Sequence, residues 1–123
     1  MRAQGLPPAL RLRRRLDFLR VQGQGTKHHV RHFLVFVVRN PTPSELPAAR
    51  LGVTVTRKVG IAVIRNRIRR WVREAFRRER RAFAPGLDMV WVAKRSAATG
   101  SYAEVYADML QLSARLRRAG DLA

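Results

Sequence analysis

The sequence predicts an α+β fold in which helices pack on a single sheet of about four strands. Three observations lead to this prediction. The chain of 123 residues suits one domain, 46% of its residues are hydrophobic, and segments of strand and helix periodicity alternate along it. When a short segment at residues 26–30 is counted as a strand, the predicted order of elements is α-β-β-β-α-β-α.

The predicted domain spans residues 13–118. Before it, two prolines and a glycine predict a flexible basic lead-in at residues 1–12. After it, residues 119–123 form a short tail. One domain with one core therefore accounts for most of the chain.

The first predicted helix covers residues 14–22, and two glycines just after it end the helical pattern. Leu16 and Leu19, joined by Phe18 and Val21, are apolar at near-helical spacing. These side chains form the expected apolar face of the helix.

Two strands follow. Residues 31–39 contain six consecutive apolar residues, rich in β-branched and aromatic side chains, so both faces of this strand should be covered. Residues 40–49 contain three prolines and form a loop. Residues 50–57 alternate between an apolar and a more polar side, which predicts a strand with one side on the core.

The longest predicted element is a helix over residues 62–83, which Pro85 and Gly86 bring to an end. At about 100° per residue, its apolar side chains share one face and its arginines spread over the opposite arc. The apolar face comprises Ile64, Ile68, Trp71, Val72, Ala75, Phe76 and Phe83.

A buried strand over residues 88–94 and a helix over residues 102–118 complete the predicted domain. Ser101 is the expected N-cap of this helix, with Glu104 at its third position. The apolar face of the helix comprises Val105, Met109, Leu112 and Leu116.

The charge of the chain is strongly positive and unevenly placed. It has 26 Lys+Arg, 8 Asp+Glu and no cysteine, with a formal net charge of +18. Residues 1–81 hold 21 basic and 4 acidic residues, net +17, so a polyanion-binding surface should come from this part. The longest apolar run, six residues, is far too short to span a bilayer. We therefore expect a cytoplasmic protein that does not associate with membranes.

The strongest chemical feature is the run of arginines on the long predicted helix. Between Arg65 and Arg81 there are nine arginines and two glutamates. Guanidinium groups match phosphate oxygens and stack on bases, while Asn66 suits a base edge or a ribose hydroxyl. The ordinary alternative is a solvated helix face, but two glutamates cannot neutralise nine arginines. A membrane-surface helix is disfavoured because the apolar face is needed for the core.

Other side chains give weaker signals. Phe18, Phe33 and Phe36 lie near basic residues, and the last two have opposite strand parity, so one of them can line a groove for a single strand. The histidine cluster at residues 28–32 lacks a neighbouring carboxylate and is interpreted as a surface loop or a nucleic-acid contact. Because no phosphate-binding loop, Ser/His/Asp arrangement or paired carboxylates occur, we predict no catalytic residues and no metal ligands.

Two adjoining segments resemble the signature of the bacterial ribonuclease P protein family. Residues 50–60, RLGVTVTRKVG, lead into residues 62–77, AVIRNRIRRWVREAFR. The flanking elements are similar as well, so the resemblance covers about residues 11–118. Two positions depart from the family pattern: Gln22 stands where relatives often have an aromatic residue, and Ile61 stands where a polar residue is frequent.

The resemblance implies a specific function. The family's catalyst is a large RNA that uses Mg²⁺ to remove the 5′ leader from precursor tRNA, and the protein is an accessory subunit. The implied partners are this RNA subunit and precursor tRNA, with no protein partner, and the Mg²⁺ is expected at the RNA active site. The resemblance also implies a left-handed strand–helix–strand crossover, as in the second domain of ribosomal protein S5, in place of the right-handed default.

The resemblance further assigns residues to two binding surfaces. The single-stranded leader is held between the first helix and the sheet, at positions matching Phe18, Phe36 and Val92, with Lys58 at the basic edge. Binding to the RNA subunit is carried by Arg65, Asn66, Arg67, Arg69, Arg70 and Arg73.

Two other classes of function stay open at this point. A purely structural RNA binder, such as a ribosomal protein, shares the composition but needs no leader cleft. A protein-only nuclease requires converging carboxylates, and the eight acidic residues are scattered along the sequence.

Overall fold

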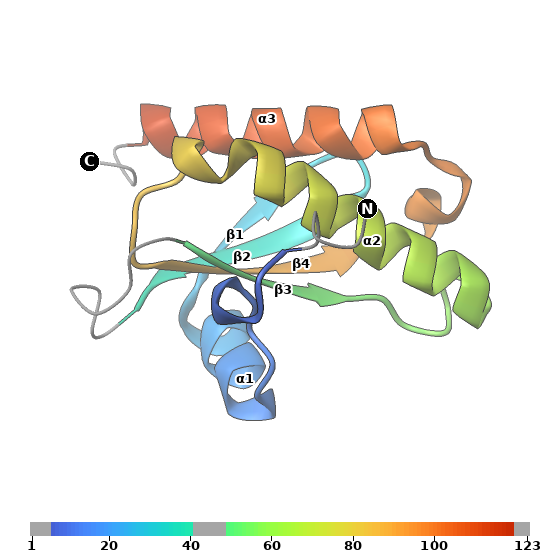
Figure 1. Cartoon of the computed structure of the whole chain (residues 1–123), viewed down its shortest axis with the longest axis horizontal. Coiled ribbons are helices and arrows are strands. Elements are labelled where there is room, and N and C mark those ends of the chain that lie inside the picture. Colours follow the sequence, from blue (N-terminus) through green and yellow to red (C-terminus); the bar gives the residue numbers. More distant parts are fainter. Residues whose placement is uncertain (1–5, 41–48, 120–123) are drawn as a thin grey trace.

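The computed structural model describes residues 6–40 and 49–119 of the chain (Figure 1). Its main elements occur in the order α-β-β-β-α-β-α, which confirms the predicted order. Short 3₁₀ turns precede α1 and lie on either side of β4. The elements are α1 (Arg15–Gln24), β1 (Thr26–His29), β2 (Phe33–Arg39), β3 (Arg50–Thr54), α2 (Ala62–Glu79), β4 (Leu87–Ala93) and α3 (Tyr102–Arg118).

The four strands form one mixed sheet in the order β1-β2-β4-β3. The pairs β1–β2 and β2–β4 are antiparallel, whereas β3 and β4 are parallel neighbours. A parallel pair cannot be joined by a tight turn, so the chain crosses over the sheet between them through α2. Most of the predicted loop before β3, residues 41–48, lies outside the described residues.

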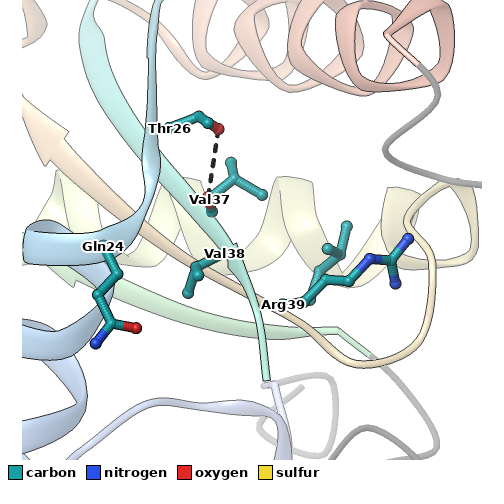
Figure 2. A pocket seen from close by; sticks show the side chains of 6 residues that line it. Gln24, Thr26, Val37, Val38 and Arg39 are labelled. Atoms are coloured by element: carbon teal, nitrogen blue, oxygen red, sulfur yellow. Dashed lines mark hydrogen bonds between the residues drawn. The ribbon is translucent and has the colours of Figure 1, made fainter. Parts of the chain in front are cut away.

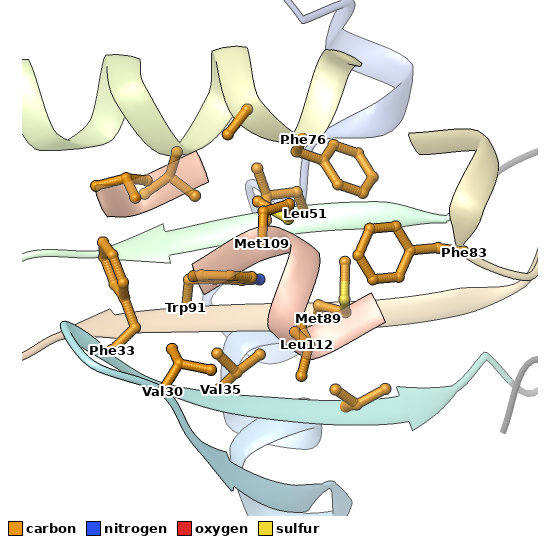
Figure 3. Packing of buried hydrophobic residues seen from close by; sticks show 14 of the residues in the cluster. Val30, Phe33, Val35, Leu51, Phe76, Phe83, Met89, Trp91, Met109 and Leu112 are labelled. Carbon is orange, nitrogen blue, oxygen red and sulfur yellow. The ribbon is translucent and has the colours of Figure 1, made fainter. Parts of the chain in front are cut away.

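The sheet lies between α1 on one face and α2 with α3 on the other (Figure 1). The large core fills the α2–α3 side, where Phe33 meets Trp91 edge-on at 5.2 Å between ring centroids (Figure 3). Phe36, of opposite parity, belongs to a smaller cluster on the α1 side. The two phenylalanines thus point to opposite faces, as predicted.

The predicted face of α3 is fully buried, whereas on the predicted face of α2 Ile64 and Trp71 are only half-buried, and Phe83 is buried beyond the end of the helix. The side chains of Val105, Met109, Leu112 and Leu116 on α3 are buried, and the Ser101 Oγ accepts the backbone N–H of Glu104 at 3.2 Å. On α2 the buried set is narrower than predicted, and regular helix ends at Glu79, where a 3₁₀ turn follows. The buried side chains of α2 are Ile68, Val72, Ala75 and Phe76.

The predicted apolar face of the first helix is confirmed for Phe18 and Val21 and wrong for Leu16 and Leu19. Leu16 and Leu19 are 76% and 51% exposed, whereas Val21 is buried and Phe18 packs against the sheet. The physical reason is that a short helix packed on one face of the sheet buries only a narrow stripe of its surface. An ion pair from Arg20 to the sheet fixes which stripe that is.

The described part of the predicted lead-in packs on the domain. Leu6 and Leu12 are buried, and the Leu12 N–H donates to the Leu51 carbonyl at 2.8 Å. Arg11 forms an isolated parallel bridge with Leu51. Residues 6–12 therefore lie along the edge of β3 that the other strands leave open.

A buried carboxylate ties α1 to the sheet. Asp88 on β4 is fully buried and accepts two hydrogen bonds of 2.9 Å from Arg50 on β3. Arg20 of α1 and the Asn40 amide also donate to it, at 2.5 and 3.0 Å. Burial alone would raise the pKa of Asp88, but these hydrogen bonds hold it below its ordinary value. The sequence reasoning assigned no role to this residue.

Candidate nucleic-acid interface

The polar side chains of α2 divide between two sides of the helix. Five of the six residues assigned to RNA-subunit binding lie within an arc of about 140° on one side. In this group Arg69 donates to the Asn66 side-chain oxygen at 2.9 Å and to the Val55 carbonyl at 3.3 Å. The Arg65 Nε donates to the Gly60 carbonyl at 3.1 Å. We call this group the α2 row: Arg65, Asn66, Arg69, Arg70 and Arg73.

Arg67 does not belong to the α2 row. Its guanidinium lies 5.1 Å from the ring centroid of Trp71 and contacts the Ala98 carbonyl, in the turn before α3. At about 100° per residue, Arg67 lies about 160° from Arg69 and about 120° from Arg73, which places its side chain on the flank of the helix toward α3. The structure therefore brings together five of the six residues and separates the sixth.

The α2 row carries positive charge that nearby carboxylates do not neutralise. Partial burial, together with repulsion from Arg11 and Arg69, lowers the pKa of Arg73. The two glutamates of α2 have other partners: Glu74 pairs with Arg77 at 2.6 Å, and Glu79 accepts a hydrogen bond from the Tyr106 hydroxyl. A row of arginines without counter-charge suits a polyanion.

The second surface is the half of the sheet that α1 leaves uncovered. Phe18 of α1 sits so close to Gly52 that a Cβ at residue 52 would lie 2.7 Å from its ring, so α1 covers the middle of β3. Farther along the strands, Leu34, Val92 and Thr54 are register partners and only half-buried. Register partners share a face, so these three form an open row, which we call the sheet shelf.

Basic and histidine side chains border the sheet shelf. On β1, Lys27 and His29 are exposed and pair with Phe36 and Leu34, so they lie on the same face. A shelf with an apolar centre and a basic border has the composition that single-stranded nucleic acids bind.

The structure gathers three of the four residues assigned to the leader. Phe18, Phe36 and Val92 belong to one apolar cluster, although Phe36 is only 9% exposed. Lys58 is exposed in the turn after β3, at the end of the sheet where Val92 lies. Leu34 was not predicted as a site residue. The signal was present, because residues two apart on a strand share a face and Leu34 therefore lies on the same face as Phe36.

The two departures from the family pattern differ in their surroundings. Gln22 is half-buried on α1, beside the buried Val21. Ile61, just before α2, is 69% exposed, and Val63 is 70% exposed. Nothing in the structure explains the exposed isoleucine.

The interpretation of the histidine cluster is wrong for His32. This residue is buried, with ring nitrogens 2.8 Å from the Ser96 hydroxyl and 2.8 Å from a Glu104 carboxylate oxygen. Its hydrogen bond lowers the pKa of Glu104. The turn between β1 and β2 is anchored to α3, because Asp108 accepts two backbone N–H groups from it. His32 therefore has a structural role in holding this turn.

A shallow hollow of about 270 Å³ lies between the end of α1 and β2 (Figure 2). Its polar side chains are Gln24, Thr26 and Arg39, without a carboxylate or histidine among the lining residues. This hollow therefore offers no acid–base pair. Within residues 6–40 and 49–119, no group of three or more His, Asp or Glu side chains is placed to hold a metal ion. None of the helices in the described part of the chain is long and apolar enough to cross a membrane.

An α+β sandwich with an unneutralised arginine row and a basic-bordered sheet shelf has the features typical of the class of nucleic-acid-binding proteins. The model of the ribonuclease P protein family matches residues 6–117. The chain belongs to this family. The ribonuclease P protein component of Desulfovibrio desulfuricans is 42% identical over 120 residues, which is 96% of this chain and 91% of the relative.

Solved structures confirm the predicted fold class. The ribonuclease P protein of Thermotoga maritima has a TM-score of 0.74 and 33% identity, covering 85% of this chain and 96% of that one. The Staphylococcus aureus protein has a TM-score of 0.75 and 26% identity, covering 93% of this chain and 98% of that one. Both similarities extend over nearly the whole described domain.

Proposed function

We propose that this chain is the protein subunit that assists a catalytic RNA in removing the 5′ leader from precursor tRNA. Membership of the ribonuclease P protein family supports the reaction. The observation that carries the assignment for this chain is the pair of separate surfaces. The α2 row suits a folded RNA, and the sheet shelf suits a single strand.

The α2 row is proposed to bind the backbone of the RNA subunit. Arg70 and Asn66 are exposed, and the guanidinium of Arg69 is held in place by hydrogen bonds to Asn66 and Val55. A guanidinium held in position loses less side-chain entropy when it meets a phosphate. The α2 row therefore serves as a preorganised phosphate-binding surface.

The sheet shelf is proposed to hold the leader of precursor tRNA. Leu34 and Val92 offer an apolar floor for unpaired bases, with Phe36 and Phe18 beneath and beside it. Lys27 on β1 and Lys58 beyond β3 flank this floor and suit the phosphates of the strand. The pattern of apolar centre and basic border fits unpaired nucleotides better than duplex RNA.

The cleavage step itself is proposed to belong to the RNA and its Mg²⁺. The carboxylates in the described part of the chain do not fit a magnesium site, because those that are buried or half-buried have protein partners. Asp88 pairs with Arg20 and Arg50, and Glu74 pairs with Arg77. Glu104 pairs with His32 and Arg31, and Asp17 pairs with Arg20. The protein contributes positive charge, which lowers the repulsion between two polyanions.

Truncating the floor of the sheet shelf is expected to reduce the affinity for leader-bearing tRNA specifically. With Leu34→Ala and Val92→Ala combined, the holoenzyme should bind precursor tRNA about tenfold more weakly, because the bases lose apolar contact area, at about 25 cal/mol per Å², against the sheet. Mature tRNA, which has no leader, should bind as before. Dissociation constants of the reconstituted holoenzyme for the two RNAs make the comparison.

Leu110→Ala is the matched control, because Leu110 is a 44% exposed leucine on α3, on the opposite side of the sheet. It should leave both affinities unchanged. Equal losses for precursor and mature tRNA in the shelf variant would contradict a leader site on the sheet.

A further inference from the structure

A cationic hollow of about 360 Å³ lies at the start of α1, away from the sheet shelf. Its walls come from three parts of the chain: the segment before α1, the first turn of α1, and the start of β3. The ionic side chains that line it are Arg11, Arg13, Arg14, Asp17 and Arg50.

The positive charge of this hollow exceeds the negative charge that faces it. The two nearby carboxylates are already matched, because Asp88 binds Arg50 and Arg20, and Asp17 lies 3.5 Å from Arg20. In the described parts of the chain, Arg13 and Arg14 form no ion pair, and both are exposed. Their donors are therefore available to an anion from outside the protein.

The hollow is built by ordered backbone. Arg11 bridges to Leu51, the Leu12 N–H donates to the Leu51 carbonyl at 2.8 Å, and the Arg11 Nε donates to the Leu6 carbonyl at 2.9 Å. Arg14 is the N-cap of α1 and makes no side-chain capping bond. The positive end of the helix dipole thus adds to the charge of the arginines.

Arg11 also connects the hollow to the α2 row. Burial is the largest cause of the lowered pKa of Arg73. Repulsion from Arg11 and then from Arg69 lowers this pKa further, so Arg11 lies close to Arg73. Arg11 therefore interacts electrostatically with the α2 row and also lines the same hollow as Arg13 and Arg14. A polynucleotide strand lying on α2 and continuing past Arg11 brings its next phosphates to the hollow.

We propose that this hollow binds a backbone phosphate of the ribonuclease P RNA, as an extension of the α2 row. The ligand is a phosphodiester of the same RNA that the row holds, so the inference rests on the proposed function. The arginines provide forked donors for the phosphate oxygens.

The test uses the full chain with Arg13→Gln and Arg14→Gln combined, and measures its affinity for the RNA subunit between 50 and 300 mM salt. Each lost phosphate contact should reduce the slope of log affinity against log salt by about 0.7–0.9. Two lost contacts correspond to roughly 20-fold weaker binding at 0.15 M salt. Arg117→Gln with Arg118→Gln, two exposed arginines at the end of α3, changes the net charge equally and should leave the slope unchanged.

Three outcomes would overturn the inference. The first is an unchanged slope in the Arg13 and Arg14 variant, and the second is an equal change in the α3 control. The third is a loss seen only in the affinity for precursor tRNA, which would assign the hollow to the substrate. Arg70→Gln, measured in parallel, separates this inference from the proposed function. If Arg70→Gln lowers the slope and the combined Arg13→Gln and Arg14→Gln variant does not, the proposed phosphate site is wrong and the proposed function stands.

Discussion

Replacing Arg69, Arg70 and Arg73 with glutamine is expected to weaken binding of the ribonuclease P RNA by roughly 100-fold at 0.15 M salt. Each phosphate contact contributes a factor of about 4 to 5 at this concentration through counterion release, and three contacts multiply. The slope of log affinity against log salt should fall by about 2 to 3 in the same titration. Circular dichroism should show a folded protein, since the buried face of α2 is formed by other residues.

The matched control replaces Arg95, Arg117 and Arg118, three exposed arginines beyond the α2 row, with glutamine. The control loses the same charge but should keep the affinity for the RNA within a few-fold. If both triple variants lose affinity alike, binding depends on net charge, and the α2 row has no specific role. Arg67→Gln provides a finer comparison, because Arg67 is turned toward Trp71 and should matter less than Arg70.

Asp88→Asn is expected to lower the free energy of unfolding by about 3 kcal/mol. The substitution keeps the size of the side chain but removes the charge that Arg20 and Arg50 share. Breaking a buried ion pair from one side costs about 3–5 kcal/mol, and the partly exposed arginines place this case near the lower end. Urea denaturation followed by tryptophan fluorescence provides the measurement.

The contribution of Asp88 also has a defined dependence on pH. Because its pKa is lower in the folded state than in the unfolded chain, its stabilisation is complete above the unfolded value of about 4. That stabilisation is lost as the pH falls through the lower folded value. The difference in stability between wild type and Asp88→Asn should therefore be constant near neutral pH and shrink below about pH 4.

A double variant tests whether the arginine and the carboxylate act as a unit. Adding Arg50→Gln to Asp88→Asn should cost less than the two single losses combined, because the pair is already broken. Additive losses would show that Asp88 stabilises the fold by other means.

The long elements were predictable because their periodicity is strong and their burial is one-sided. Residues 102–118 were assigned as a helix with the bounds seen in α3, and all four predicted core positions of α3 are buried. The rotation of α1 was not predictable, because four apolar residues compete for one narrow stripe. A residue far away in sequence, Asp88, selects the stripe by pairing with Arg20. The left-handed crossover had no local signal and rested on the resemblance alone.

The candidate site shows the same division between local and distant determinants. Helical periodicity groups Arg69 with Arg73, and it also turns Arg67 away, which plotting the helix at 100° per residue would have shown. The sheet shelf depends on strand register, which pairs Leu34 with Val92 across 58 positions of sequence. The phosphate hollow depends on residues 6–12 folding against β3, whereas their composition had suggested a loose segment.

Cleavage of precursor tRNA at low magnesium tests the central claim most directly. The full chain, the ribonuclease P RNA, or both are incubated with 5′-labelled precursor tRNA, and release of the leader is followed over time. We expect no cleavage by the protein alone, weak cleavage by the RNA alone, and strong cleavage when both are present, because added positive charge reduces the need for magnesium. Leader release by the protein without the RNA, or no stimulation of the RNA by the protein, would contradict the account.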